Sequence, residues 1–236
     1  MKKLILLNEL KKYPVFNTKI VSELTKKQRA YSKLIIFRLK KEGLIFEIER
    51  DKYSVYNDPL TVASRIAWPS YISLWSAFRF YNMTEQLPQT IFVITTRSRR
   101  RKIKFSGTDI IFTKASPKYF FGFNKQMRNS SIIFIACMEK AIIDSLLFRK
   151  ISISEIIEIL ENNIKIIDID KLIEYLLKIK NKSIIKRIGY ILDKNSFDCY
   201  FKLKQYINNK YILLEHKLPY KGEKNKKWKV IDNVGI

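Results

Sequence analysis

The sequence has few of the residues from which metal sites and acid–base catalysts are usually built. Its 236 residues include one histidine, His216, and two cysteines, Cys137 and Cys199. The cysteines form neither a Cys-x-x-Cys pair nor a Cys/His spacing, so no zinc site is expected. A Gly-x-Ser-x-Gly elbow, which positions the nucleophile of many hydrolases, is also missing. We therefore expect no catalytic residue, no metal site and no cofactor.

Long hydrophobic runs are missing as well. No run is long enough to span a bilayer. The apolar start, Leu4 to Leu7, is short for a signal peptide, and charged Glu9 and Lys11 follow at once. Neither tandem repeats nor a low-complexity linker divides the chain. We expect a cytoplasmic protein with no membrane partner.

Acidic residues are scarce relative to basic ones. There are 22 Asp and Glu against 46 Lys and Arg, which gives a formal net charge of +24. Such an excess indicates a polyanionic partner, most often nucleic acid, with an anionic membrane surface as the runner-up. A lysine- and isoleucine-rich composition is also typical of an AT-rich genome or a hot habitat. At 47% hydrophobic residues, the chain can still bury a substantial core.

The first 57 residues show the pattern of three helices. Apolar spacing predicts a first helix that ends before Pro14, and Asn17 is expected to cap a second. Thr25 is expected to cap a third helix, which runs from Lys26 to Glu42.

A hairpin is predicted directly after these helices. Gly43 stands where a left-handed residue ends a helix. Residues 44–49 and 52–56 are strand-like and flank a turn. This order is typical of a winged helix-turn-helix. We therefore expect an α+β fold, with a winged helix-turn-helix DNA-binding domain at residues 1–57 and a mixed α/β region with C-terminal helices at residues 58–236.

The third predicted helix has one polar, basic face that also includes Ile36. Two apolar stripes, one through Tyr31, Ile35 and Leu39 and one through Ala30, Leu34 and Phe37, cover the rest. We expect the polar face to enter a DNA groove, because Arg and Lys pair with guanine edges and Ile can touch a thymine methyl. From this domain, the residues expected to contact double-stranded DNA are Lys26, Lys27, Gln28, Arg29, Ser32, Lys33, Lys40, Arg50 and Lys52. Alternatively, these charges only solvate a protein-interaction domain.

The densest basic run of the chain extends from Arg97 to Lys104, with six positive side chains in eight positions. It lies between strand candidates at residues 90–96 and 109–113, so an exposed hairpin or loop is expected. We predict phosphate contacts by Arg97, Arg99, Arg100, Arg101, Lys102 and Lys104. A solvated loop without a ligand is the alternative.

The remainder of residues 58–236 is predicted to hold a further strand at 131–137 and several helices. Ser152 with Glu155 forms a capping box, and Asp168 or Asp170 caps another helix. Helices are also expected at residues 138–148, 183–192 and 196–207. We expect the short C-terminal helices to pack on the preceding sheet.

The stretch from Trp68 to Tyr81 is predicted to be a buried helix with Pro69 in its first turn. Ser70, Ser73 and Ala77 would form a ridge of small residues along it, and a loop at Gln86-Leu-Pro88 would follow. We interpret these serines as packing residues.

Taken together, several phrases of the sequence resemble the AbiEi family of antitoxins. They are Tyr53-Ser-Val-Tyr-Asn-Asp-Pro59, Ala63-Ser-Arg-Ile-Ala-Trp-Pro-Ser-Tyr-Ile-Ser-Leu-Trp-Ser-Ala77, Gln86-Leu-Pro88, Ala136-Cys-Met-Glu-Lys-Ala-Ile-Ile-Asp144 and Trp228-Lys-Val-Ile-Asp-Asn233. The pattern covers most of the chain.

This resemblance implies a cytoplasmic transcriptional autorepressor of a bacterial or archaeal abortive-infection toxin–antitoxin operon. Its partners would be double-stranded operator DNA, bound as cooperating copies, and a nucleotidyltransferase toxin that it antagonises through its C-terminal region. A stable complex with the toxin is not expected. No base contact is carried over from the family.

Two other classes of function stay open. Asp198, followed by Glu215-His-Lys217 after an apolar run, is a faint pattern of a metal-dependent nuclease or another nucleic-acid-processing enzyme. The third class is a winged-helix scaffold with no role at DNA.

Overall fold

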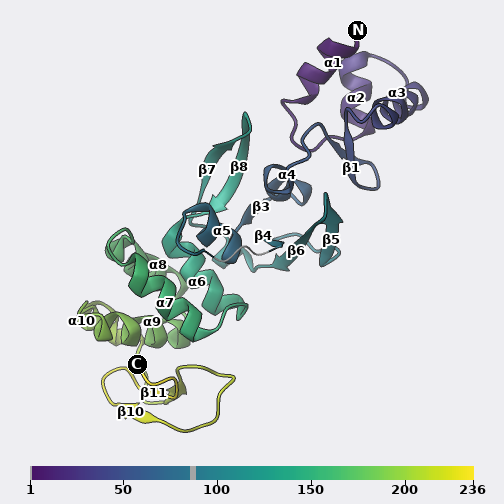
Figure 1. Ribbon diagram of the computed structural model, residues 1–236. Coiled ribbons are helices and arrows are strands. Elements are labelled where there is room, and N and C mark those ends of the chain that lie inside the picture. Colours follow the sequence, from purple (N-terminus) through teal and green to yellow (C-terminus); the bar gives the residue numbers. More distant parts are fainter. Residues whose placement is uncertain (1, 86–88) are drawn as a thin grey trace. The chain divides into compact units, whose positions relative to one another are not determined.

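The computed structural model describes residues 2–85 and 89–236 of the chain (Figure 1). It is a mixed α+β fold that ends in a series of helices. Two compact units are present: residues 1–72 with 87–135, and residues 73–86 with 136–236. They divide the chain differently from the boundary at residue 57, which stays a prediction. The loop expected at Gln86-Leu-Pro88 lies outside the described residues.

The first unit begins with three helices and a hairpin, in the predicted order (Figure 1). They are α1 (Lys3–Leu10), α2 (Thr18–Thr25), α3 (Arg29–Lys41), β1 (Phe46–Glu49) and β2 (Lys52–Ser54). As predicted, Asn17 caps α2 by accepting a 3.1 Å hydrogen bond from the Ile20 amide. Gly43 adopts a φ of +69°, which the left-handed end of α3 requires. Their shared core consists of Leu6, Leu10, Phe16, Val21, Ile36, Leu39 and Ile45.

The start of α3 differs from the prediction. Thr25 is the last residue of α2, and Lys26 ends that helix in a left-handed conformation with φ 53°. Helix α3 begins only at Arg29, after Gln28. Lys26, Lys27 and Gln28 therefore form the turn between the two helices.

The rest of the first unit contains a mixed sheet of six strands, β3 (Ser70–Ile72), β4 (Thr90–Thr95), β5 (Lys102–Phe105), β6 (Thr108–Lys114), β7 (Phe123–Arg128) and β8 (Ser131–Ala136). Their order in the sheet is β5-β6-β4-β3-β8-β7. Strands β3 and β8 run parallel, as do β4 and β6, whereas β4 is antiparallel to β3 and β5 to β6. Helix α4 (Pro59–Ile66), capped by Asp58, packs on β3, β4 and β6.

The prediction of a single helix from Trp68 to Tyr81 is wrong. Residues Ser70–Ile72 form β3, which lies inside the sheet between β4 and β8, and only Trp75–Phe80 form a helix, α5. Pro69 directly precedes this strand and does not open a helix. All three residues of β3 are fully buried. A strand buried on both faces lacks the alternation of polar and apolar residues that distinguishes a strand from a buried helix.

The second unit consists of α5 and the C-terminal helices with a small sheet. Its further helices are α6 (Met138–Phe148), α7 (Ile153–Asn163), α8 (Ile169–Ile179), α9 (Lys182–Lys194) and α10 (Tyr200–Leu203). The predicted capping box of Ser152 and Glu155 and the cap by Asp168 are confirmed. The helix predicted at 196–207 is shorter, because it comprises only α10 and a 3-10 turn at Lys204–Tyr206.

A three-stranded sheet of β9 (Ile212–Leu213), β10 (Glu223–Asn225) and β11 (Val230–Asp232) ends the chain and was not predicted. Its β11 packs on α9. These elements and the helices form a compact unit with residues 73–86. The structure therefore differs from the expectation that these helices pack on the preceding sheet, because they pack mainly within their own unit.

Within the part of the chain that the structure describes, no helix combines the length and the apolar character that crossing a membrane requires.

Candidate nucleic-acid interface

Helix α3 presents a different face outward from the one that its sequence predicted. Ser32, Ile36 and Leu39 are buried, at 0%, 4% and 3% exposure. The hydroxyl of Ser32 donates a 3.2 Å hydrogen bond to the Gln28 carbonyl. Ser32 is therefore not a DNA contact, and Ile36 cannot touch a thymine methyl.

The outward face of α3 instead carries one of the two predicted apolar stripes. Leu34 is 40% and Phe37 is 61% exposed, and Ala30 precedes them by one helical turn. On a helix of 3.6 residues per turn, these residues lie opposite Leu39 and Ser32. The prediction fails because a serine is compatible with both a polar surface and a buried position, and here Ser32 is buried with its hydroxyl bonded to the backbone of its own helix. The exposed Arg38 and Lys41 on this side were missed for the same reason.

Most of the basic residues predicted to contact DNA from the turn and from α3 are exposed to solvent. Lys26, Lys27, Gln28, Arg29 and Lys33 are all exposed. Lys40 is an exception in part, because its ammonium pairs with the Glu47 carboxylate of β1. Helix α3 contains five basic residues and no acidic one.

The turn of the hairpin lies close to this basic face. Arg50 is exposed, and the Asp51 carboxylate accepts hydrogen bonds from the amide of Thr18, at 3.0 Å, and from its hydroxyl. Burial opposes ionisation of Asp51, but the hydrogen bonds from Thr18 and the charges of Arg29 and Lys33 hold its pKa below the ordinary value. Asp51 therefore carries a negative charge beside the start of α3, where it orients the hairpin against the helices.

Lys52 is turned inward and does not extend from the tip of the hairpin. Its ammonium donates a 2.6 Å hydrogen bond to the Ile66 carbonyl at the end of α4 and pairs with Glu49 at 2.8 Å. The expected minor-groove contact by Lys52 is therefore replaced by a tie between the hairpin and α4. Arg50 is the residue that stays available at the turn.

Arg99 is held by protein groups. Its side chain is 12% exposed, its guanidinium donates a 2.9 Å hydrogen bond to Glu49, and it stacks 3.8 Å above the ring of Phe112. Burial alone would raise the pKa of Glu49, but Lys52 and Arg99 together lower it. Arg99 thus joins the basic run to the first hairpin, and the phosphate contact expected of it stays a prediction.

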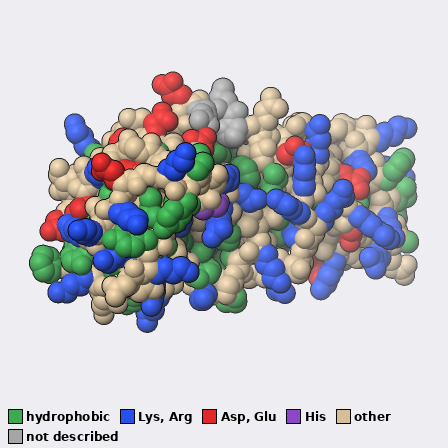
Figure 2. Space-filling model, turned by 90° about the horizontal axis from the view of Figure 1, so that it is seen from below, with side chains coloured by type: hydrophobic (Ala, Val, Ile, Leu, Met, Phe, Trp, Pro, Cys, Tyr) green, Lys and Arg blue, Asp and Glu red, His purple; other side chains and the backbone are tan. Residues whose placement is uncertain are grey.

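The other members of the basic run reach solvent. Arg97, Arg100 and Arg101 precede β5 and are exposed. In β5, an edge strand, Lys102 and Lys104 point outward while Ile103 and Phe105 are buried. Lys102 also pairs with Asp109 of β6 at 2.7 Å. On the face drawn in Figure 2, Lys and Arg side chains are widespread and Asp and Glu side chains are sparse.

A buried polar cluster joins two phrases that are far apart in the sequence. Ser73 donates a 2.8 Å hydrogen bond to Asp144 Oδ2, and Asp144 Oδ1 pairs with the ammonium of Lys140 one turn earlier on α6. All three residues are fully buried. A nucleophile or base without access to solvent has no route to a large substrate, so this cluster is structural.

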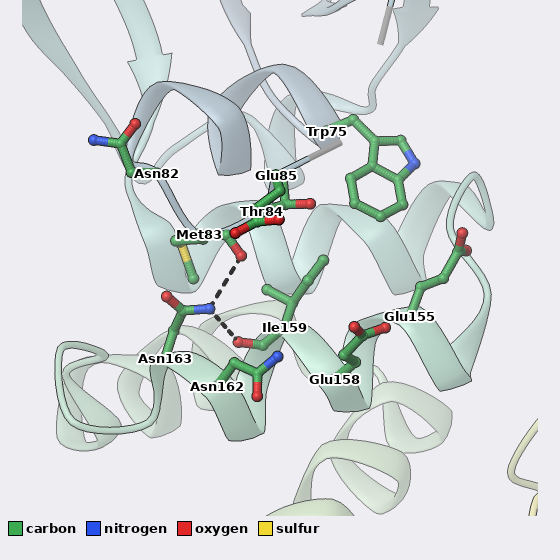
Figure 3. A pocket seen from close by; sticks show the side chains of 10 residues that line it. All are labelled: Trp75, Asn82, Met83, Thr84, Glu85, Glu155, Glu158, Ile159, Asn162 and Asn163. Carbon is green, nitrogen blue, oxygen red and sulfur yellow. Dashed lines mark hydrogen bonds between the residues drawn. The ribbon is translucent and has the colours of Figure 1, made fainter. Parts of the chain in front are cut away.

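One hollow of the second unit is lined by acidic side chains, although the protein as a whole has a positive net charge. It measures about 340 Å³ and is lined by Trp75 of α5, by Glu155 and Glu158 of α7, and by Glu85 (Figure 3). Glu155 is already engaged in capping α7. Asn163 closes one side by donating hydrogen bonds to the Met83 and Ile159 carbonyls. Because carboxylates repel phosphates, this hollow is not part of a nucleic-acid interface.

The residues of the faint nuclease pattern have separate structural roles. Glu215 is 5% exposed and accepts hydrogen bonds from the amides of Ile153 and Lys217. Asp198 lies at the surface and pairs with Lys227 at 3.5 Å. Among residues 2–85 and 89–236, no three side chains of His, Cys, Asp or Glu are grouped to hold a metal ion.

No family model matches this chain, and a search of curated proteins found no match to it.

Proposed function

We propose that this protein binds double-stranded DNA through an N-terminal winged helix-turn-helix and represses transcription of its own operon. The observation that carries the proposal is the outward face of α3, on which Arg29, Lys33, Arg38 and Lys41 are exposed and no acidic residue is present. Such a face attracts phosphates from both edges of a groove.

A second basic surface supports the same ligand. Arg97, Arg100, Arg101 and Lys104 are exposed along and before the edge strand β5. The pair of Arg99 with Glu49 ties this run to the first hairpin, whose turn carries Arg50. A duplex bound at α3 would therefore gain phosphate contacts from the basic run, and these contacts would be independent of base sequence.

The antitoxin part of the proposal comes from the AbiEi-like phrases. We propose that residues 58–236 antagonise a nucleotidyltransferase toxin encoded beside this protein, without a stable complex. The contact of Ser73 with Asp144 supports a common structural role for the last residues of the Pro-Ser-Tyr-Ile-Ser and Glu-Lys-Ala-x-x-Asp phrases. Co-expression with the neighbouring open reading frame tests this part, and relief of growth arrest is the expected result.

DNA binding is tested by electrophoretic mobility shift with a duplex from upstream of the protein's own gene. We expect Arg29→Ala/Lys33→Ala to lose specific retardation. The matched control is Lys165→Ala/Lys221→Ala, which removes two exposed charges from the second unit and leaves the same net charge. Because net charge is equal, a loss confined to the α3 variant assigns binding to this face. Equal retardation of both variants would refute the assignment.

We propose no catalytic step. Incubation of the protein with plasmid DNA and Mg²⁺ or Mn²⁺ tests this directly. Cleavage by wild-type protein that is lost in Glu215→Ala would establish the nuclease alternative instead.

A further inference from the structure

The outward face of α3 combines an apolar centre with basic edges. Ala30, Leu34 and Phe37 follow the axis of the helix, and Phe37 exposes 61% and Leu34 40% of its surface. Arg29 and Lys33 lie on one side of this stripe and Arg38 lies on the other. We call Ala30, Leu34 and Phe37 the α3 apolar stripe.

The exposure of this stripe needs an explanation, because exposed apolar side chains do not contribute to solubility. Leu34 and Phe37 lie opposite the buried Ser32 and Leu39, so they do not serve the core. Exposing two large apolar side chains to water in the middle of a basic surface is unfavourable in free energy unless a ligand covers them.

We infer that the α3 apolar stripe reads the 5-methyl groups of thymine in the major groove, so that the DNA ligand is rich in A·T pairs. This inference rests on the proposed DNA binding. The major groove is about 12 Å wide, admits one helix, and displays the thymine methyl as its only apolar group. Basic side chains on both flanks match the two rows of phosphates that border the groove.

Charge also argues against the other occupant of such a stripe, a second copy of this chain. A second copy would bring the same arginines and lysines against this face, on a protein whose formal net charge is already +24. DNA supplies the opposite charge together with the apolar methyl groups. The partner that satisfies both halves of the surface is therefore a thymine-containing duplex.

The test compares two duplexes that differ only in the methyl group. One is an alternating dA-dT duplex of about 20 base pairs, or two helical turns, and the other replaces every dT by dU. Backbone charge and hydrogen-bonding groups are the same in both. Burial of one methyl is worth about 0.8 kcal/mol, which corresponds to about fourfold in affinity. We expect wild-type protein to prefer the dT duplex by about fourfold for one buried methyl and by more than tenfold for two.

Variants assign the preference to the stripe. Leu34→Ala/Phe37→Ala should bind the dT and dU duplexes equally, at the affinity of wild-type protein for the dU duplex. The matched control, Leu4→Ala/Ile5→Ala, removes two exposed apolar side chains from α1 and should keep the wild-type preference. Because all four side chains are exposed, thermal melting should show both variants folded.

Each other outcome has a definite meaning. Equal binding of the two duplexes by wild-type protein overturns methyl reading and leaves DNA binding intact. Failure to bind any duplex overturns the proposed function instead. A wild-type dimer that becomes monomeric in Leu34→Ala/Phe37→Ala, with no change in the dT to dU ratio, makes the stripe an interface between copies and overturns the inference.

Discussion

Ser73 and Asp144, which are 71 residues apart in the sequence, are joined by a hydrogen bond of 2.8 Å in the buried interior of the second unit. The same carboxylate pairs with Lys140 on the preceding turn of α6. A serine that precedes a helix and an ion pair within another helix thus form one polar cluster. This cluster links segments 73–86 and 136–236 of the unit.

We predict that Asp144→Ala lowers the free energy of unfolding by about 3–5 kcal/mol, because it leaves the fully buried ammonium of Lys140 without this carboxylate. Asp170→Ala is the matched control, since Asp170 forms a surface pair with Lys202 and is 85% exposed. The control should cost less than about 1 kcal/mol. Urea denaturation of both variants measures the difference, and equal costs would contradict a structural role for the cluster.

A close contact between Gly189 of α9 and Trp228 gives a second prediction. A Cβ at residue 189 would lie 2.0 Å from the Trp228 ring, so Gly189→Ala must displace the indole. We expect a loss of about 1–3 kcal/mol, as in other overpacked cores, and a red shift of the tryptophan fluorescence as Trp228 gains water. In Trp228→Leu the clash is absent, so Gly189→Ala added to that variant should cost much less. Equal costs in both backgrounds would show that the ring does not pack on Gly189.

The charges around the first hairpin give a third prediction. Arg99→Gln should lower stability, because Arg99 bridges Glu49 and Phe112, and should leave the salt dependence of DNA binding unchanged. Arg100→Gln/Arg101→Gln should keep stability and reduce the slope of log affinity against log salt by about 1 for each phosphate contact removed. Thermal melting and titrations at several salt concentrations separate the two effects. A reduced slope in Arg99→Gln would show that this residue reaches the DNA.

The pair of Glu139 and Lys171 predicts how stability depends on pH. Burial opposes both charges, but the 3.0 Å pair lowers the pKa of Glu139 below its usual 4.5 and raises the pKa of Lys171 from 10.5 to about 12. A folded pKa above the unfolded one gives stability that is complete below pH 10.5 and is lost as the pH rises to about 12. On the acid side, the contribution of Glu139 is complete above pH 4.5 and is lost as the pH falls.

The variant Lys171→Met isolates this contribution. The difference in unfolding free energy between wild type and variant should be largest and flat near neutral pH, and should shrink toward both limits. Its plateau is expected at about 2 kcal/mol, below the full cost of breaking a buried pair, because Lys171 keeps 34% of its side chain exposed. A difference that does not change with pH would show that Lys171 acts through packing of its stem.

Local sequence signals predicted local structure well. Asn17, Ser152 and Asp168 each accept a hydrogen bond from an amide of the helix they precede, and Gly43 takes a left-handed conformation after α3. These features depend on a few neighbouring residues. The prediction failed for Thr25, because the choice between extending one helix and ending another depends on how α2 and α3 pack.

Side-chain roles were harder to predict than elements. Lys52 and Arg99 look like free cations in the sequence, yet each is held by Glu49 and by a group far along the chain, the Ile66 carbonyl or the Phe112 ring. Likewise, Ser32 is a polar residue in a core, and Phe37 is an aromatic residue at the surface. One helical sequence is compatible with more than one buried face, and its partners decide between them.

By itself, the sequence determined the positions of most helices and of the main strands, their caps, and the strong positive charge that favours a nucleic-acid ligand. Only the tertiary structure decided that Ser70–Ile72 form a strand inside the sheet, that Ser32 turns inward, and that Leu34 and Phe37 face outward among basic residues. The physical reason is the range of the interactions. Caps and periodicity act within a few residues, whereas burial and ion pairing depend on which distant segments come together.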